Sequence, residues 1–261
     1  GVAGAGLSTM LANLFQASDA VWLWRRATQP EGPLPASRDR DRESRRTILR
    51  IGGPSGLQWG LEVVSWTLMS GFIARFGDPS LAAHAIVSRI IGVSFMPGHA
   101  IGEAGGILVG QAVGAKSAEA ARKSYRSARL AALSLMGALG LVFALVPGWL
   151  SGPFHASPSA SLIAADLLLV AAVFQLADGL LLVTAAALNA SGHSRFTMVT
   201  GLSLAWGYWV PLAWYFTVHE GHGAVAAWLA LLAQVIANAT IFSLRWRRVS
   251  RRIGIAQIGI A

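Results

Sequence analysis

Residues 52–74 have the sequence GGPSGLQWGLEVVSWTLMSGFIA, which reads as a continuous membrane helix except for one acidic side chain, Glu62, in its middle. Residues 167–188 have the sequence LLLVAAVFQLADGLLLVTAAAL and repeat this pattern around Asp178. A charged side chain near the centre of a bilayer costs about 3 kcal/mol even on scales derived from membrane insertion. Because the chain keeps two such charges, we interpret them as functional. The usual functions are the movement of ions, protons or cationic solutes.

The composition predicts a membrane protein. Of the 261 residues, 54% are hydrophobic and 13% are charged, whereas soluble domains have about 25% charged residues. Apolar windows recur that are long enough to cross a hydrocarbon core about 30 Å thick. A soluble all-helical protein is disfavoured because these windows lack polar faces. We therefore predict an all-α membrane protein, a polytopic helical bundle, with spans at residues 1–24, 47–73, 81–113, 127–150, 161–190, 197–218 and 223–244.

The basic residues are unevenly distributed between the connections. Almost all of the 21 Lys and Arg lie in residues 25–50, 116–129 and 245–252 or at Arg195, which fall in alternate connections. Such an asymmetry predicts a multi-pass plasma-membrane protein with these connections and its C-terminus in the cytoplasm. The net charge of +9 is not interpreted as a nucleic-acid patch, because no aromatic residues are interleaved with it.

Four regions follow from these patterns. Residues 25–46 are rich in proline and in charges of both signs, which predicts a solvated cytoplasmic linker. Residues 1–24 precede it as a single span, which we interpret as the last transmembrane helix of a missing N-terminal lobe. Residues 47–244 form a six-helix transmembrane lobe, and residues 245–261 form a basic cytoplasmic tail. The odd number of spans and the absence of an initiating Met suggest the C-terminal piece of a longer protein.

The second span after the linker carries a packing signal. Glycines spaced four apart let two helix backbones approach closely in lipid, and the ridge consists of Gly98, Gly102, Gly106, Gly110 and Gly114. Tight packing is the simpler interpretation; a surface along which a neighbouring helix slides is the alternative. Pro54 and Pro97 are predicted to kink or break their helices. Residues 116–129 are predicted to form an amphipathic basic helix at the cytoplasmic membrane surface.

Glu62 and Asp178 are the candidate coupling residues. Both lie near the middle of their spans, and Gln58 and Gln175 precede them by about one turn on the same helices. Burial disfavours the charged form of a carboxyl group, so the pair could take up and release protons. Two carboxylates with amide and backbone oxygens could instead hold Na⁺. The alternative for each is a structural polar anchor that hydrogen-bonds to a neighbouring helix.

Other polar residues are supporting candidates. His99 and Glu103 stand four apart on one helix and could pass protons or simply cap a polar crevice beside Pro97. Arg89 could neutralise a buried carboxylate or extend to an interface. We expect interhelical hydrogen bonds rather than ligand contacts from Asn189, Gln234 and Asn238. Interface belts and core packing account more often for aromatics such as those of the fifth span after the linker, but a flat organic cation could contact the rings of Trp206, Tyr208, Trp209 and Trp214.

Other functional classes have little support. The chain has no cysteine, which excludes disulfides and thiolate metal sites. Nothing in it matches a hydrolase triad, a phosphate-binding loop or a dinucleotide fingerprint, so an enzyme is not predicted. No cofactor is predicted, and no metal site other than a Na⁺ site at Glu62 and Asp178.

The runs GGPSGLQWGLEVVSW, LAAHAIVSRI, FMPGHAIGEAGGILVGQAVGA and FQLADGLLLVTAAALNASG resemble the second half of the multidrug and toxic compound extrusion (MATE) family. The resemblance implies one six-helix lobe of a twelve-helix antiporter, together with the preceding helix. Such antiporters export cationic drugs or other organic xenobiotics in exchange for H⁺ or Na⁺ by alternating access. The family's coupling carboxylates would correspond to Glu62 and Asp178. The chain departs from the family pattern at Leu188–Ala190, where an Arg-Gly pair is common, and at His99 and Glu103.

Two other functions remain open at this point. One is a lipid-linked oligosaccharide flippase of the same superfamily, although such flippases tend to place cationic residues in their central cavity. The other is a non-transporting membrane scaffold. The expected partners are the lipid bilayer, small organic and cationic substrates and the missing N-terminal lobe, and no nucleic acid.

Overall fold

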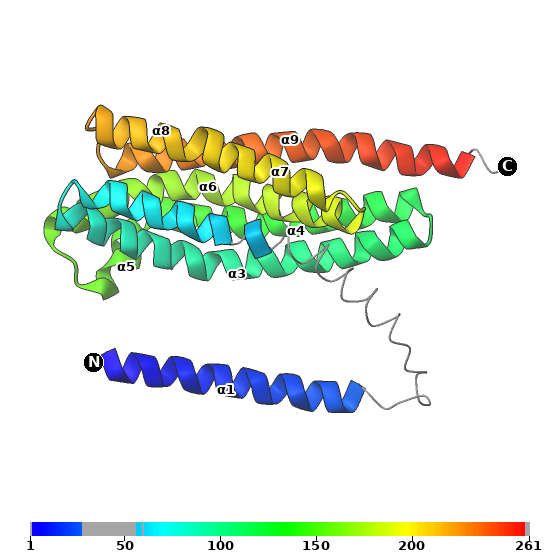
Figure 1. The fold of residues 1–261 in the computed structure, drawn as a ribbon, viewed down its shortest axis with the longest axis horizontal. Coiled ribbons are helices and arrows are strands. Elements are labelled where there is room, and N and C mark those ends of the chain that lie inside the picture. The colour runs from blue at the N-terminus through cyan, green and yellow to red at the C-terminus, as the bar shows by residue number, and fades with distance from the viewer. Residues whose placement is uncertain (1, 28–55, 59, 259–261) are drawn as a thin grey trace. The chain divides into compact units, whose positions relative to one another are not determined.

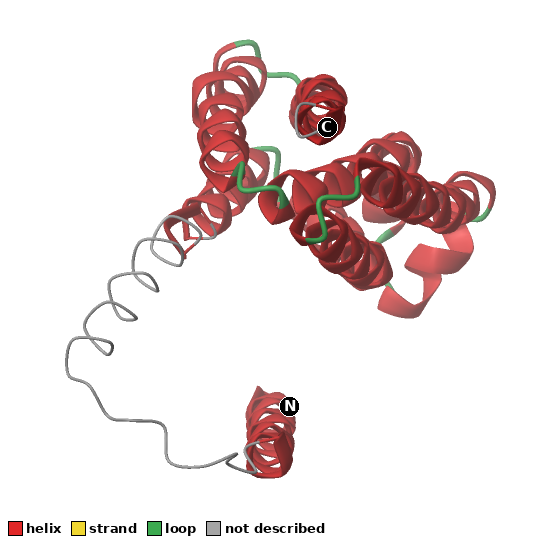
Figure 2. Cartoon of the chain, turned by 90° about the vertical axis from the view of Figure 1, so that its right-hand side faces the viewer, coloured by secondary structure: helices red, strands yellow, loops and turns green. Residues whose placement is uncertain are grey.

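The computed structural model describes residues 2–27, 56–58 and 60–258, and its regular elements in these ranges are all helical (Figures 1 and 2). The chain divides into two units, residues 1–50 and 51–261. The first unit contains helix α1 (Val2–Ala27), which ends with Arg25 and Arg26 in its last turn. Basic side chains there interact favourably with the negative end of the helix dipole. Pro54 and most of the predicted linker lie outside the described residues.

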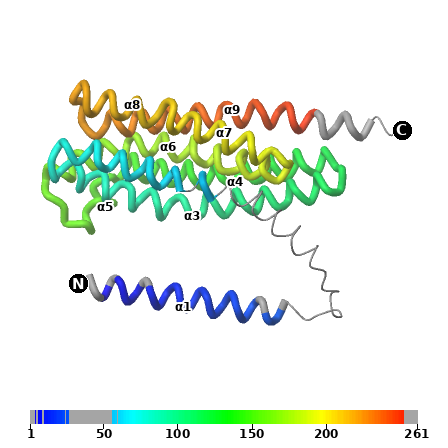
Figure 3. Tube along the Cα trace, in the orientation of Figure 1, coloured from blue at the N-terminus to red at the C-terminus, as the bar shows by residue number. Residues whose placement is uncertain are grey.

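The second unit is a bundle of long helices joined by short turns (Figure 3). A helix spans residues 60–74. The elements that follow it are α3 (Asp78–Gly114), α4 (Ala118–Leu145), α5 (Pro147–Ser151), the short 3₁₀ helix η1 (Gly152–Phe154), α6 (Pro158–Ala190), α7 (Ser194–Leu204), the π-helical segment η2 (Ala205–Trp209), α8 (Val210–Trp214), the π-helical segment η3 (Tyr215–His219) and α9 (Ala224–Ile258).

Local sequence signals set the helix ends. Ser117 and Ser157 cap α4 and α6 by accepting hydrogen bonds from the backbone three residues later, each at 3.3 Å. A serine at this position satisfies one of the otherwise unbonded N–H groups of the first turn. Gly77 and Gly192 adopt φ values of 88° and 82° in the turns before α3 and α7. Glycine adopts such values without steric cost.

Helix α6 lies at the centre of the bundle, where it packs against α3, α4 and α9. Four helices of the described residues are long and apolar enough to cross a membrane: α3, α4, α6 and residues 224–251 of α9. Several large apolar side chains at their surfaces are exposed, such as Leu145 and Leu162, as expected for positions that face lipid. These observations confirm an all-α, polytopic membrane fold. The other predicted windows are also helical, over residues 2–27, 60–74 and 194–219.

The glycine ridge on α3 faces α6. A Cβ atom at Gly102 would lie 3.3 Å from the backbone of Leu182, and one at Gly106 would lie 3.2 Å from the carbonyl oxygen of Ala186. Contacts therefore advance by four residues on both helices, which run parallel and in close contact. At Gly114 a Cβ atom would meet nothing within 4 Å, so the close approach stops before the end of α3. The helix continues through Pro97.

The helix predicted over residues 116–129 is present from Ala118 onward, but it is continuous with the span that follows it. The segment does not form a separate surface helix but begins the long helix α4, and Tyr125 on its inner side is buried. The Tyr125 hydroxyl lies 3.0 Å from Thr184 Oγ1 on α6, and its ring centroid lies 4.9 Å from that of Trp246 on α9. The small and aromatic residues of this amphipathic helix face the bundle rather than the membrane surface.

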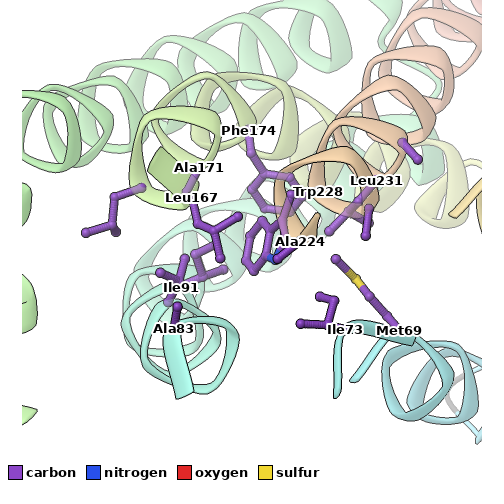
Figure 4. Packing of buried hydrophobic residues seen from close by; sticks show 14 of the residues in the cluster. Met69, Ile73, Ala83, Ile91, Leu167, Ala171, Phe174, Ala224, Trp228 and Leu231 are labelled. Atoms are coloured by element: carbon purple, nitrogen blue, oxygen red, sulfur yellow. The ribbon is translucent and has the colours of Figure 1, made fainter. Parts of the chain in front are cut away.

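An apolar cluster of described residues surrounds Trp228 on α9 (Figure 4). The Trp228 side chain is fully buried. Met69 and Ile73 of the helix 60–74 pack in the same cluster, as do Leu167 and Phe174 of α6. Tryptophan supplies a large contact area here, and this packing joins the helix that carries Glu62 to α6 and α9.

Candidate functional site

A cavity of about 300 Å³ opens among residues 56–74, α3, α6, α7, η2 and α9. Its volume is at the lower end of the range for small-molecule sites. Its polar lining residues are Gln58, Glu62, Ser65, His99, Glu103, Asp178, Asn189, Gln234 and Asn238. Its aromatic lining residues are Trp66, Phe95, Phe174, Trp209 and Phe242.

Most of the sequence-predicted site residues line this one cavity. Glu62 and Asp178 reach it from the helix 60–74 and from α6, and His99 and Glu103 reach it from α3. Gln58 lies one turn before Glu62 and lines it too. The chain therefore folds so that three carboxylates from three helices border the same space.

Two of the predicted supporting polar residues do not line the cavity. The side chain of Gln175 is fully buried, and both its amide atoms lack a hydrogen-bond partner among the described residues. Three residues of a helix turn the chain by about 300°, so Gln175 is offset from the direction of Asp178. Arg89 is exposed on α3. It does not line the cavity.

Asp178 is the most constrained of the three carboxylates. Only 7% of its surface is exposed, and its Oδ2 atom has no hydrogen-bond partner within the described part of the chain. A buried carboxylate without a partner is costly unless a proton or a cation neutralises it. The arrangement at Asp178 is therefore suited to binding a proton or a cation.

Glu62 and Glu103 are more open. Both side chains are exposed in the described structure, and neither is among the groups that form ion pairs in it. The close contact of Gly102 with α6 brings the neighbouring Glu103 to the cavity. Gly102 meets Leu182, one turn beyond Asp178, and Glu103 follows Gly102, so Glu103 lies roughly 7 Å further along the bundle than Asp178.

Sequence reasoning missed or misjudged part of the lining. Ser65 and Trp66 follow Glu62 within about one turn, and this spacing is a signal that could have identified them. Asn189 does make the expected interhelical hydrogen bond, accepting from Thr197 Oγ1 at 2.6 Å. Asn238, by contrast, is 3% exposed, lines the cavity and has no partner for its Oδ1 atom among the described residues.

The aromatic residues that were grouped on the fifth span separate in the structure. Trp209 is buried and lines the cavity. Tyr208 and Trp214 are exposed, and Trp206 does not line the cavity. Trp209 ends the π-helical segment η2. Such segments occur frequently at functional sites because they change the direction of the side chains that follow.

The charges of the cavity are of one sign. The described residues that line it include three carboxylates and His99 but no Lys or Arg. Low-dielectric walls focus such a negative potential and raise the local concentration of cations. Within the described residues no group of three His, Asp or Glu is placed to hold a metal ion. The site is therefore suited to protons, to a weakly coordinated monovalent cation or to an organic cation.

Comparisons with known proteins agree with this fold. The family model described as MatE matches residues 54–215. A "Probable multidrug resistance protein NorM" of Bradyrhizobium diazoefficiens is 33% identical, covering 97% of this chain and 56% of the relative. A protein of the same printed name from Burkholderia pseudomallei is 30% identical, covering 88% of this chain and 48% of the relative. The chain thus spans about half the length of the curated relatives it matches.

Solved structures are similar over the same region. A structure described as the outward-facing conformation of a multidrug resistance MATE family transporter of the MOP superfamily superposes with a TM-score of 0.77. It is 20% identical, and the match covers 95% of this chain and 55% of that chain. A MOP superfamily transporter from Pyrococcus furiosus gives a TM-score of 0.78 at 21% identity, with the same coverage. These likenesses concern the fold.

Proposed function

The chain belongs to the MATE family, and on this premise we propose that it forms the C-terminal lobe of an antiporter. The antiporter exports organic cations, including drugs, in exchange for H⁺ or Na⁺. The relatives named above are called multidrug resistance proteins and are about twice as long as this chain. A second lobe of similar size would face the cavity and complete it. The protein would lie in the plasma membrane, with its C-terminus in the cytoplasm.

One observation carries the proposal. Two carboxylates from different helices, Glu62 and Asp178, line a single cavity whose described lining residues include no Lys or Arg. The cavity can therefore bind a cation by electrostatic attraction, and the buried Oδ2 atom of Asp178 provides a site where that cation replaces lost hydration. The absence of Lys and Arg from the described lining disfavours the flippase alternative, which calls for cationic residues that bind lipid phosphates.

The mechanism follows from competition for the same negative charge. When a proton or Na⁺ binds between Glu62 and Asp178, it neutralises part of the cavity and weakens the attraction for an organic cation. By linkage, the bound organic cation weakens the affinity for the coupling ion to the same degree. Exchange across the membrane then requires only that the two lobes alternate between inward-open and outward-open states around this site.

His99, Glu103 and Gln58 support this function in the proposal. They line the cavity around the two coupling carboxylates and would contact the substrate or its water. The glycines of the ridge from Gly98 to Gly110 hold α3 against α6 and thereby keep Glu103 and Asp178 at the same cavity. Pro54 and Pro97 remain candidate hinges.

The test is the substitution Glu62→Gln in the full-length protein. We expect drug efflux to fall about 10- to 100-fold, the factor for losing a hydrogen bond or ion contact to a charged group. Membrane insertion should be unchanged or improved, because the substitution removes a charge from a membrane span. Efflux of a fluorescent cation such as ethidium from cells provides the measurement.

A matched control is Glu119→Gln, which neutralises an exposed carboxylate of α4 outside the cavity. The control should retain normal efflux at equal abundance. Normal efflux by the Glu62→Gln protein at the same abundance would contradict the proposed coupling role.

A further inference from the structure

His84 links three helices at a buried position behind the cavity. It lies near the start of α3 and is 3% exposed. Its Nε2 atom lies 3.0 Å from the hydroxyl of Ser70 on the helix 60–74. Its Nδ1 atom lies 3.2 Å from the indole Nε1 of Trp228 on α9. One imidazole ring therefore contacts a side chain from each of two other helices.

The chemistry of the partners fixes which nitrogen of His84 carries the proton. An indole N–H can only donate, so Trp228 donates to Nδ1, and Nδ1 carries no proton. The ring is then neutral and its proton is on Nε2, from which it is donated to the oxygen of Ser70. The hydroxyl of Ser70 in turn donates to the backbone oxygen of Trp66 at 3.0 Å. The hydrogen bonds thus form one chain, from Trp228 through His84 and Ser70 to the backbone oxygen of Trp66, and each donor in it has an acceptor.

The same network places an aromatic wall of the cavity. The His84 ring stacks on Trp66 with centroids 6.4 Å apart and planes inclined by 21°. Trp66 also meets Trp209 edge-on at 5.9 Å and Trp228 edge-on at 6.2 Å. Trp66 and Trp209 line the cavity, whereas His84 and Trp228 do not. His84 thus lies behind the wall and supports it, and Trp66 stands one turn from Glu62.

We propose that His84 is a positioning residue which, as the neutral Nε2–H tautomer, holds Trp66 in the cavity wall and thereby sets the affinity for substrates with an aromatic ring. This inference rests on the proposed function. The position of residue 84 requires a flat face for Trp66, an acceptor for Trp228 and a donor for Ser70. A neutral histidine supplies all three. Trp66 then presents its face or edge to a bound ring close to the negative charge of Glu62, an environment that favours flat organic cations.

The tautomer is tested first, without reference to transport. Solid-state NMR of the full-length protein in lipid, with ¹⁵N-labelled histidine, distinguishes a protonated from an unprotonated Nδ1. The His84 signal is assigned by its loss in the His84→Phe protein. We expect a neutral ring with the proton on Nε2, and in the Trp228→Phe protein a change at Nδ1. A proton on Nδ1 in the wild type would overturn the proposal.

The functional test compares two cations of different shape. Ethidium has a flat aromatic ring system, whereas tetraethylammonium has none, and both carry one permanent charge. In the His84→Phe protein, which retains a flat ring but loses both hydrogen bonds, we expect the Kd for ethidium to rise about tenfold. The Kd for tetraethylammonium should be unchanged, as should both values in the His222→Phe control, which alters an exposed histidine in a loop.

The outcomes distinguish a failure of the positioning role of His84 from a failure of the proposed transport function. Unchanged ethidium affinity in the His84→Phe protein, or an equal loss for both cations, overturns the positioning role and leaves the proposed function standing. The Trp228→Phe protein gives an independent answer if His84→Phe fails to fold, because it removes one hydrogen bond and should weaken ethidium binding selectively. If the wild-type protein binds neither cation, both the proposed function and this inference fall.

Discussion

Burial distinguishes the three acidic residues of the cavity. Asp178 is buried with one carboxylate oxygen unpartnered among the described residues, whereas Glu62 and Glu103 are exposed. A buried carboxylate interacts strongly with a small ion because the local dielectric constant is low. An exposed carboxylate keeps its water and contributes less. We therefore assign ion coupling to Asp178 together with Glu62, and a weaker role in substrate attraction to Glu103.

This assignment predicts a selective effect of Glu103→Gln. The substitution should weaken binding of an organic cation about 2- to 5-fold, the range for an exposed charge pair, and leave binding of the coupling ion unchanged. Titration of the purified protein with tetraethylammonium and with Na⁺ or H⁺ gives the two affinities. Asp166→Asn, which alters an exposed carboxylate of α6 outside the cavity, serves as the control. A loss of ion binding equal to that of Glu62→Gln would instead place Glu103 in the coupling site.

At the residue scale, depth in a span was a good guide to the cavity. Glu62, Asp178, His99 and Glu103 were identified because a charged or titratable side chain inside a membrane span has a cost that must be offset. His84 escaped notice because its partners, Ser70 and Trp228, are on other helices, and Trp228 is 144 positions away in the sequence. Only the packing of the helices shows that its two nitrogens are satisfied.

At the scale of elements, the contact between α3 and α6 positions the site. A Cβ atom at position 106 would lie 3.0 Å from the Cβ atom of Ala186 and 3.2 Å from the carbonyl oxygen of Ala186. The two helices can approach so closely only because α3 has glycines there. In lipid, where apolar side chains gain nothing by leaving water, such backbone contact is a main source of helix association.

We accordingly predict that Gly106→Val destabilises the protein. Overpacking typically costs about 1–3 kcal/mol, which corresponds to a fall in Tm of roughly 2–10 °C for a chain of this size. Gly114→Val makes the same chemical change in the same helix, where an added Cβ atom meets nothing within 4 Å. Thermal unfolding in detergent should show a lower Tm for the Gly106 variant only, and equal values for the two would show that the glycine contact is dispensable.

The presence of the helices could be predicted from the sequence. Their ends, and the π-helical segments that interrupt them, were harder to predict. Hydrophobic length identified α3 and α6 within a few residues and the start of α9 within one residue, but α9 continues to Ile258, 14 residues beyond the predicted end of its span. The start of α4 was misjudged because Arg122, Lys123 and Arg126 suggested a membrane surface, while the buried stripe around Tyr125 depends on Trp246 and Thr184 from other helices. The π-helical segments on either side of α8 left no periodic signal, since each disturbs the helical repeat by a single residue.

At the scale of the whole molecule, the directions of the helices agree with the positions of the basic residues in the sequence. Asp78 and Lys116 lie at opposite ends of α3, and the contact between Tyr125 and Trp246 brings the start of α4 and the basic end of α9 together. The basic residues at the start of α4 and at the end of α9 are therefore gathered at one end of the second unit, as the asymmetric distribution of Lys and Arg predicts.

This arrangement predicts the orientation in the membrane. The chain has no cysteine, so each introduced cysteine adds a single reactive thiol to this part of the protein. Cysteines replacing Lys116 or Arg247 should be protected from an impermeant thiol reagent in intact cells, and those replacing Asp78 or Glu220 should react. All four should react after the cells are opened. Reaction at position 116 in intact cells would reverse the proposed orientation.

The central claim is that Glu62 and Asp178 act as one cation site. It is tested most directly by efflux driven by an imposed pH or Na⁺ gradient in Glu62→Gln, Asp178→Asn and the double variant. Groups that act as a unit are strongly non-additive. We predict that each single substitution removes most of the coupling, about 10-fold or more, and that the double variant is little worse than either. Two partial defects whose factors multiply in the double variant would show independent roles and contradict the shared site.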